Sequence, residues 1–163
     1  FYPEKWEDYV KNIPVNERDD LIKAYGKRIE GELGIKEKNK SLLKWATWEY
    51  SISKLIPDSD EKIKKELFKN NMYKTFAILE YHYFKNNCFV EKNFLKNKNV
   101  YKKISHIPLE IVHGRYDLVC PVSIAYELHK LAPHSKLSIT HAGHTMFDYG
   151  NAKKIIEITN KYK

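Results

Sequence analysis

The chain has 163 residues, of which 42% are hydrophobic and 13% aromatic. A chain of this size and apolar content can bury about two thirds of the surface that it exposes when unfolded, which excludes an extended disordered protein. Its apolar runs are only a few residues long, whereas a membrane-spanning helix needs about 20 apolar residues. The sequence begins with Phe1 and has no signal-peptide pattern, so we expect it to be part of a longer, cytoplasmic protein.

The net charge of +8 comes from 26 Lys and only 3 Arg, accompanied by 12 Asn. Proteins that read bases or clamp phosphates usually rely on Arg, whose planar guanidinium matches those targets. We therefore interpret the lysines as a solvated surface and expect no nucleic-acid partner and no membrane partner. The two cysteines, Cys88 and Cys120, fit a reducing compartment, and no Cys/His spacing of the zinc type occurs, so we expect no metal site.

Residues 1–95 show helical periodicity, many charges and no strand-like alternation, and we assign them to an all-helical domain. The pattern predicts helices at residues 19–29, 41–56, 60–68 and 72–84. The first of these is expected to end near Gly31 and Gly34, with the charged residues 36–40 forming the turn that follows.

Residues 96–163 follow a different pattern, which predicts an α/β fold. The β-prone residues 109–113 precede a predicted helix at 121–131, a second strand at 136–140 and a last helix at 151–162. A strand, a helix and a strand with short connections predict a right-handed crossover and a parallel sheet. Because parallel sheets are buried on both faces, we expect this βαβα unit to be a remnant at the edge of a larger sheet.

Asp117 and His144 each follow a predicted strand by four residues. Catalytic groups of open parallel sheets gather at the carboxyl ends of the strands, so we expect the two side chains at one edge, as an acid that orients a base. Taken singly, Asp117 could cap a turn and His144 could be a polar loop residue. Their separation by 27 residues, the length of a βαβ unit, favours the catalytic interpretation.

The stretches His-Gly-Arg-Tyr-Asp-Leu-Val-Cys-Pro (113–121) and Ala-Gly-His-Thr-Met-Phe (142–147) resemble the Asp and His motifs of the α/β-hydrolase fold, specifically of the proline iminopeptidases. Residues 48–49, 57–58 and 79–84 resemble the helical cap of that family.

This resemblance implies that residues 1–95 form the cap and residues 96–163 the C-terminal part of the hydrolase core. It implies that Asp117 and His144 are the acid and base of a Ser-His-Asp triad. The substrates would be short peptides with a free N-terminal proline, and no cofactor would be needed.

Two carboxylates of the helical half, Glu49 and Glu80, lie at apolar positions. Aromatic and small apolar residues lie three, four or seven positions from Glu80. The helical stripe that contains Glu49 also includes Leu42, Trp45, Ile52 and Ile56. A carboxylate in such a place needs a cation or a hydrogen-bond partner. A nearby lysine would serve, but two such residues suggest the free α-ammonium of a peptide, which acidic cap residues bind in the family that the chain resembles.

Cys120 stands at the predicted start of a helix, and one interpretation is a small buried hydrophobic residue. The resemblance implies instead a thiol near the pocket for the N-terminal proline, accessible to thiol reagents and not the nucleophile. Tyr83 and Phe147, together with Trp48 and Phe84, are candidates to line this apolar pocket. Aromatic residues at helical spacing are more often part of an ordinary core.

The nucleophile of a serine hydrolase of this fold stands in a Gly-x-Ser-x-Gly turn, and the sequence contains none. It also lacks the family's His-Gly-Gly-Pro-Gly segment. We therefore expect the serine upstream of Phe1 and the chain alone to be inactive. The alternatives are another α/β-hydrolase (an esterase, epoxide hydrolase or dehalogenase) and a non-catalytic, lysine-rich binding module.

Overall fold

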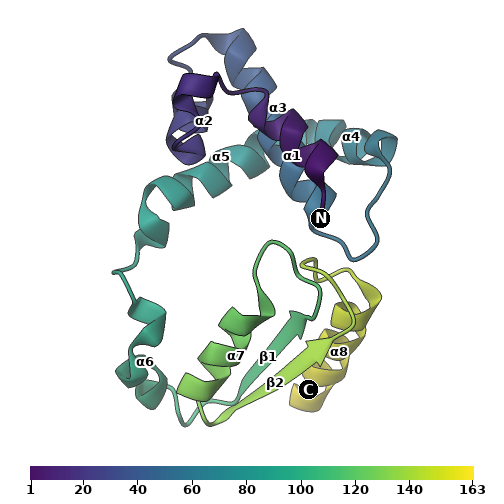
Figure 1. The fold of residues 1–163 in the computed structure, drawn as a ribbon. Coiled ribbons are helices and arrows are strands. Elements are labelled where there is room, and N and C mark those ends of the chain that lie inside the picture. The colour runs from purple at the N-terminus through teal and green to yellow at the C-terminus, as the bar shows by residue number, and fades with distance from the viewer. The chain divides into compact units, whose positions relative to one another are not determined.

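The computed structural model describes all residues from 1 to 163, and the chain forms two compact units. The first unit comprises Phe1–Ser51 and Asp58–Val90, and the second comprises Ile52–Pro57 and Glu91–Lys163. Figure 1 labels the helices and the two strands along the chain. No helix combines the length and the apolar character that crossing a membrane requires.

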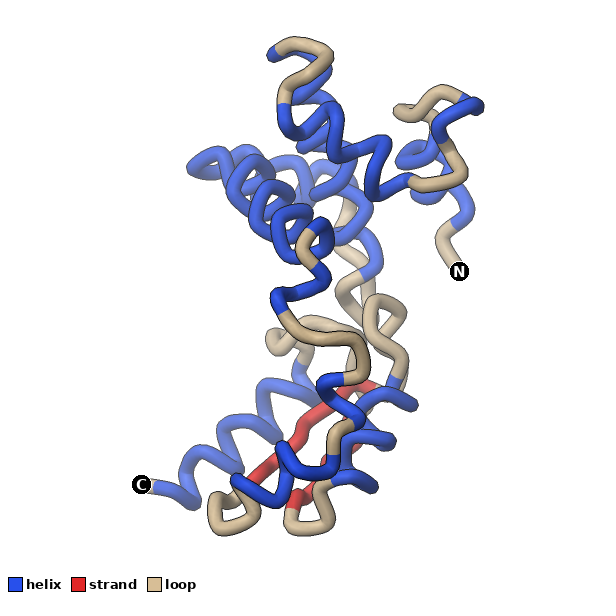
Figure 2. The backbone as a smooth tube through the Cα atoms, turned by 90° about the vertical axis from the view of Figure 1, so that its left-hand side faces the viewer, coloured by secondary structure: helices blue, strands red, loops and turns tan.

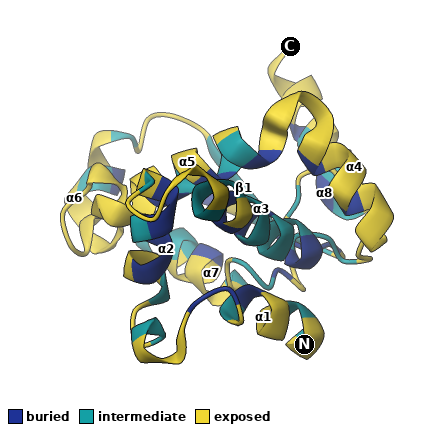
Figure 3. Cartoon of the chain, turned by 90° about the horizontal axis from the view of Figure 1, so that it is seen from above, coloured by how far each residue is buried: buried dark blue, intermediate teal, exposed yellow.

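The first unit is built from helices. They are α1 (Pro3–Val10), α2 (Leu21–Glu30), α3 (Ile35–Ile52), α4 (Asp60–Phe68) and α5 (Met72–Lys85), with short 3-10 turns at Val15–Glu17, Lys69–Asn71 and Asn87–Phe89. Side chains cap two of them, because Asp20 accepts a hydrogen bond from the backbone N–H of Lys23 and Ser59 accepts one from that of Lys62. Figure 3 shows that α4 is largely exposed, whereas α3 is buried or half-buried along most of its length.

Aromatic side chains fill the core of this unit. The rings of Tyr9 and Tyr25 stack with their centroids 4.4 Å apart, and Trp45 meets Tyr25 edge-on at 5.5 Å. All three are at least 93% buried, so they remove a large apolar area from water. The packing of α1 and α2 against α3 therefore positions the residues that follow Trp45 on α3.

The two ends of α3 differ from the sequence prediction. Residues 36–40 are helical rather than a turn, because the chain reverses at Gly31 and Gly34, whose φ values of 92° and 85° suit only glycine without strain. Lys and Glu, which dominate residues 36–40, are good helix formers. At the other end α3 stops at Ile52, and Ile56 is 80% exposed, so the buried stripe does not extend to residue 56.

The second unit contains a parallel two-stranded sheet, as predicted. Strand β1 (Leu109–Gly114) pairs with β2 (Ser135–Thr140) from Leu109 opposite Ser135 to Gly114 opposite Thr140. The helices α7 (Val122–Leu131) and α8 (Tyr149–Thr159) pack against both strands (Figure 2). The short helix α6 (Lys98–Lys103) and 3-10 turns at Phe94–Lys96 and Asn160–Tyr162 complete the unit. The sequence pattern did not predict α1 or α6, which have only eight and six residues.

Candidate active site

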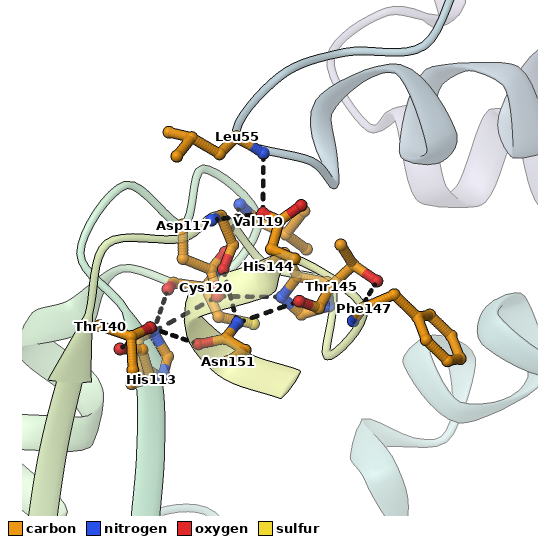
Figure 4. Close-up of polar contacts among 12 residues, drawn as sticks. Leu55, His113, Asp117, Val119, Cys120, Thr140, His144, Thr145, Phe147 and Asn151 are labelled. Carbon is orange, nitrogen blue, oxygen red and sulfur yellow. Dashed lines mark hydrogen bonds and ion pairs between the residues drawn. The ribbon is translucent and has the colours of Figure 1, made fainter. Parts of the chain in front are cut away.

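Asp117 and His144 lie in hydrogen-bond contact at the carboxyl ends of the two strands. His144 Nδ1 is 3.0 Å from Asp117 Oδ2 (Figure 4). The in-register pairing of β1 with β2 brings this about, because the two strands end opposite each other and both loops leave the same edge. The Asp117 side chain is 4% exposed, whereas that of His144 is 41% exposed. The acid is therefore enclosed and the imidazole remains accessible.

Backbone groups hold the Asp117 carboxylate from its other side. Oδ1 accepts hydrogen bonds from the N–H groups of Val119 at 2.9 Å and Cys120 at 2.8 Å. This Asx-type turn forms within the loop between β1 and α7, so the residues after Asp117 themselves orient it. Oδ2 is left to face the imidazole of His144.

The loop that carries His144 is anchored by the segment that follows α3. The N–H groups of His144 and Thr145 both donate to the carbonyl oxygen of Ser53, each at 2.9 Å. Asp148 adds a second link, because its Oδ2 accepts from the N–H of Gly143 at 2.7 Å and from that of Leu55 at 2.9 Å. These links explain why residues 52–57 belong to the second unit.

Asn151 supports the same loop from α8. Its Nδ2 donates to the carbonyl oxygens of Gly143 at 3.2 Å and Thr145 at 3.0 Å, and its Oδ1 accepts from the hydroxyl of Thr140. Asn151 is only 4% exposed, so these bonds are shielded from water. Neither Asn151 nor Asp148 was predicted from the sequence, although a polar residue on the inner face of α8 is a signal that could have identified Asn151.

Two glycines allow the two loops to approach each other. A Cβ at Gly114 would lie 2.0 Å from the carbonyl oxygen of Gly143, and a Cβ at Gly143 would lie 2.6 Å from the backbone nitrogen of Leu55. Both clashes are with backbone atoms, which cannot rotate away. Glycine at these positions is therefore a steric requirement of the Asp117–His144 contact.

The orientation of His144 determines what this pair can do. Because Nδ1 faces the carboxylate, it carries the proton, and Nε2 is left as a lone-pair acceptor. Such an imidazole can accept a proton from a hydroxyl nucleophile, and the adjacent carboxylate stabilises the imidazolium that forms. The contact geometry is therefore compatible with a base and an acid that orients it.

The carboxylates of Glu49 on α3 and Glu80 on α5 lie near each other in the first unit. Trp45 Nε1 donates a hydrogen bond to Glu80 Oε2 at 2.6 Å. Burial, and then the charge of Glu80, raises the pKa of Glu49 to about 8. The pKa of Tyr9 is also raised, by burial and by both carboxylates. From the sequence we expected either a nearby lysine or the ammonium of a substrate as the partner of Glu49, and the structure contains no such lysine.

We expect the free energy of unfolding to fall between about pH 5 and pH 8 because of Glu49. Its pKa in the folded chain, about 8, exceeds the ordinary 4.5, so the folded state keeps a proton that the unfolded state releases in this window. Glu49→Gln should remove about 1–3 kcal/mol of that decline, since residual solvent contact reduces the full effect. Urea unfolding at pH 5 and pH 8.5 measures it. Glu61→Gln, at an exposed position of α4, is the control, and equal pH dependence in both variants would contradict the assignment.

The remaining predicted binding residues are accessible. Cys120 is exposed, so the interpretation as a small buried residue is wrong. Tyr83 is 51% and Phe147 80% exposed, and neither belongs to a core. Phe84 is 42% exposed, whereas Trp48 packs partly buried against the aromatic core of the first unit.

The sequence comparisons point to one group of enzymes, although no family model matches the chain. It is 36% identical over 162 residues to the "Probable proline iminopeptidase" of Leptolyngbya boryana, with 99% of this chain and 49% of that protein covered. It is 36% identical over 164 residues to the proline iminopeptidase of Xylella fastidiosa, with coverage of 99% and 50%. The proline iminopeptidase of Arabidopsis thaliana is 35% identical over 164 residues, with coverage of 99% and 42%.

The chain thus spans about half the length of the curated relatives that it matches. The similarity extends over nearly every residue of the chain and includes both units and the loops that carry Asp117 and His144. By its sequence, this chain is similar over 99% of its length to curated proline iminopeptidases at 35–36% identity.

Proposed function

We propose that this chain supplies the acid–base pair and the amine-binding carboxylates of a serine peptidase that releases N-terminal proline from short peptides. In this proposal residues 96–163 are part of an α/β-hydrolase core, β1 and β2 belong to a larger parallel sheet, and residues 1–95 are its helical cap. The observation that carries the proposal is the contact between Asp117 Oδ2 and His144 Nδ1 at 3.0 Å. The names of the relatives support the choice of substrate.

The proposed chemistry runs through Nε2 of His144. It accepts the proton of a serine hydroxyl as the serine oxygen attacks the carbonyl carbon of the N-terminal proline residue. His144 then gives this proton to the leaving amine, and the C–N bond breaks to leave an acyl-enzyme. A water molecule, deprotonated by the same nitrogen, hydrolyses the ester and releases proline. Asp117 keeps the proton of the neutral imidazole on Nδ1 throughout.

Glu49 and Glu80, called here the acidic pair, are proposed to hold the cationic amine of the substrate. Two carboxylates that repel each other are stabilised by a cation placed between them, and the secondary ammonium of an N-terminal proline offers two N–H donors. The raised pKa of Glu49 supports this proposal. Burial and the charge of Glu80 disfavour the ionised form of Glu49, and a cation bound nearby would offset both effects. A requirement for a free amine would restrict the enzyme to the ends of peptides.

Cys120, Tyr83 and Phe147 are proposed to contact the apolar ring of the proline. All three are exposed, so none is occupied in a core. Cys120 also shares the loop of Asp117 through its backbone N–H. A bulky group attached to the Cys120 thiol would, in this proposal, obstruct the substrate without touching the nucleophile.

The nucleophile is proposed to come from residues outside these 163, since no Gly-x-Ser-x-Gly occurs within them. We expect the isolated chain to release no arylamine from a prolyl-arylamide. A protein that contains this chain together with a segment carrying that serine should release it and be inactivated by a fluorophosphonate. Inhibitor-sensitive hydrolysis by the isolated chain, or a larger protein that acts only on acyl esters, would contradict the proposal.

A further inference from the structure

A second imidazole contacts the Asp117 carboxylate. His113, the fifth of the six residues of β1, places Nε2 3.3 Å from Asp117 Oδ2, the same oxygen that binds His144. The same Nε2 is 2.9 Å from the carbonyl oxygen of Cys120 (Figure 4). Both of these neighbours are acceptors. His113 must therefore carry a proton on Nε2, which it donates to the carbonyl oxygen of Cys120, while Asp117 Oδ2 lies beside the same nitrogen.

Cys120 links His113 to the acid through hydrogen bonds on both sides of its backbone. The peptide N–H of Cys120 donates to Asp117 Oδ1 at 2.8 Å, and the carbonyl oxygen of Cys120 accepts from His113. The side chains of Asp117 and His113 are only 4% and 16% exposed, so water has little access to replace a lost donor. An unsatisfied acceptor in such surroundings is unfavourable.

We propose that His113 is a positioning residue for the Asp117–His144 pair. The N–H groups of Val119 and Cys120 fix Oδ1 but still allow the carboxylate to rotate about that oxygen. The imidazole of His113, held by the carbonyl of Cys120, lies 3.3 Å from Oδ2 and limits its movement, so that the plane of the carboxylate points at Nδ1 of His144. The inference rests on the proposed function only in naming His144 as the base, since the contacts themselves stand without it.

His113 is unsuited to act as the base itself. Its Nε2 donates to the carbonyl oxygen of Cys120, and its side chain is less than half as exposed as that of His144. His144, in contrast, has Nδ1 on the carboxylate and is open to solvent. In this proposal His113 limits the movement of Oδ2, whereas His144 binds the same oxygen through Nδ1 and acts as the base.

Nuclear magnetic resonance of the ¹⁵N-labelled chain tests this without substrate or nucleophile. In the unmodified chain, long-range ¹H–¹⁵N correlations should show His113 protonated at Nε2 and His144 at Nδ1. In His113→Leu, the Nδ1–H of His144 should exchange with water about five- to tenfold faster, the factor that loss of one hydrogen bond brings. His113→Gln keeps an amide donor near the Nε2 position and should restore exchange to within about twofold of the original rate.

His106→Leu, at an exposed histidine of the same unit, is the matched control and should change nothing at His144. Unchanged exchange in a folded His113→Leu chain, or equal acceleration in the Leu and Gln variants, would overturn the positioning role. If the Leu variant does not fold, the tautomer decides, because an Nδ1–H form of His113 cannot donate from Nε2 to the carbonyl oxygen of Cys120. None of these outcomes depends on peptidase activity, so they separate this inference from the proposed function.

Discussion

Asp117→Asn is expected to lower kcat for a prolyl-arylamide about 10⁴-fold in an active enzyme that contains this chain. The amide of Asn presents an N–H where the carboxylate presents an acceptor, so Nδ1 of His144 must lose its proton to keep the contact. The proton then resides on Nε2, and the nitrogen that should accept the serine proton can no longer do so. The imidazolium also loses its neighbouring negative charge.

The steady-state rate of arylamine release with saturating substrate measures this effect. Asp19→Asn makes the same chemical change at an exposed position before α2 and should leave kcat within about twofold, as expected for a surface substitution. Because Asn can still accept from Val119 and Cys120, the loop should keep its shape, and KM should change little. A loss of less than about tenfold would show that Asp117 is not the acid of the triad.

Glu49→Gln and Glu80→Gln are expected to reduce kcat/KM for prolyl-arylamide by about 30-fold or more. Removing one partner of a buried charged contact costs about 2–5 kcal/mol, because the other charge is left without compensation. An acyl ester without an amine makes no such contact, so its hydrolysis should stay within about threefold of the original rate. The ratio of kcat/KM for the prolyl-arylamide to kcat/KM for the acyl ester is the decisive quantity, because a general loss of active protein lowers both values equally.

The two carboxylates should not be equivalent. Glu80 also accepts from Trp45 Nε1, so its replacement by Gln disturbs the aromatic core, and we expect the Glu80 variant to be the less stable one. Glu61→Gln on α4 is the control for charge, because it removes one negative charge at an exposed position. An equal loss on both substrates would remove the amine-binding role from the acidic pair.

Much of the second unit was predictable because its pattern is local. Short β-prone runs, a helix between them and their order predict a parallel pair, and that pairing places the residues after each strand at one edge. Asp117 and His144 could therefore be chosen from spacing alone. The contact of His113 with Asp117 Oδ2 was not predictable, because the position of a residue within a strand does not show which atoms its side chain will meet.

The end of α3 shows why a helix boundary predicted from the sequence can be wrong. Periodicity predicts helix to residue 56, but Pro57 has no N–H and cannot pair with the carbonyl of Ser53 within a helix. That carbonyl instead accepts from His144 and Thr145, which are more than 90 residues away in the sequence. The chain leaves the helix where a distant loop supplies better donors, and no window of local sequence contains that information.

The sequence by itself determined the identity of the chemical groups, their order along the chain and the periodicity that makes each half helical or α/β. Those properties depend on residue type and near neighbours. The tertiary structure decided which backbone atoms hold His144, that Asp117 is shared by two imidazoles, and that Glu49 lies beside Glu80 with a pKa of about 8. These properties arise from burial and from contacts between residues remote in sequence, whose strength depends on distance and on the exclusion of water.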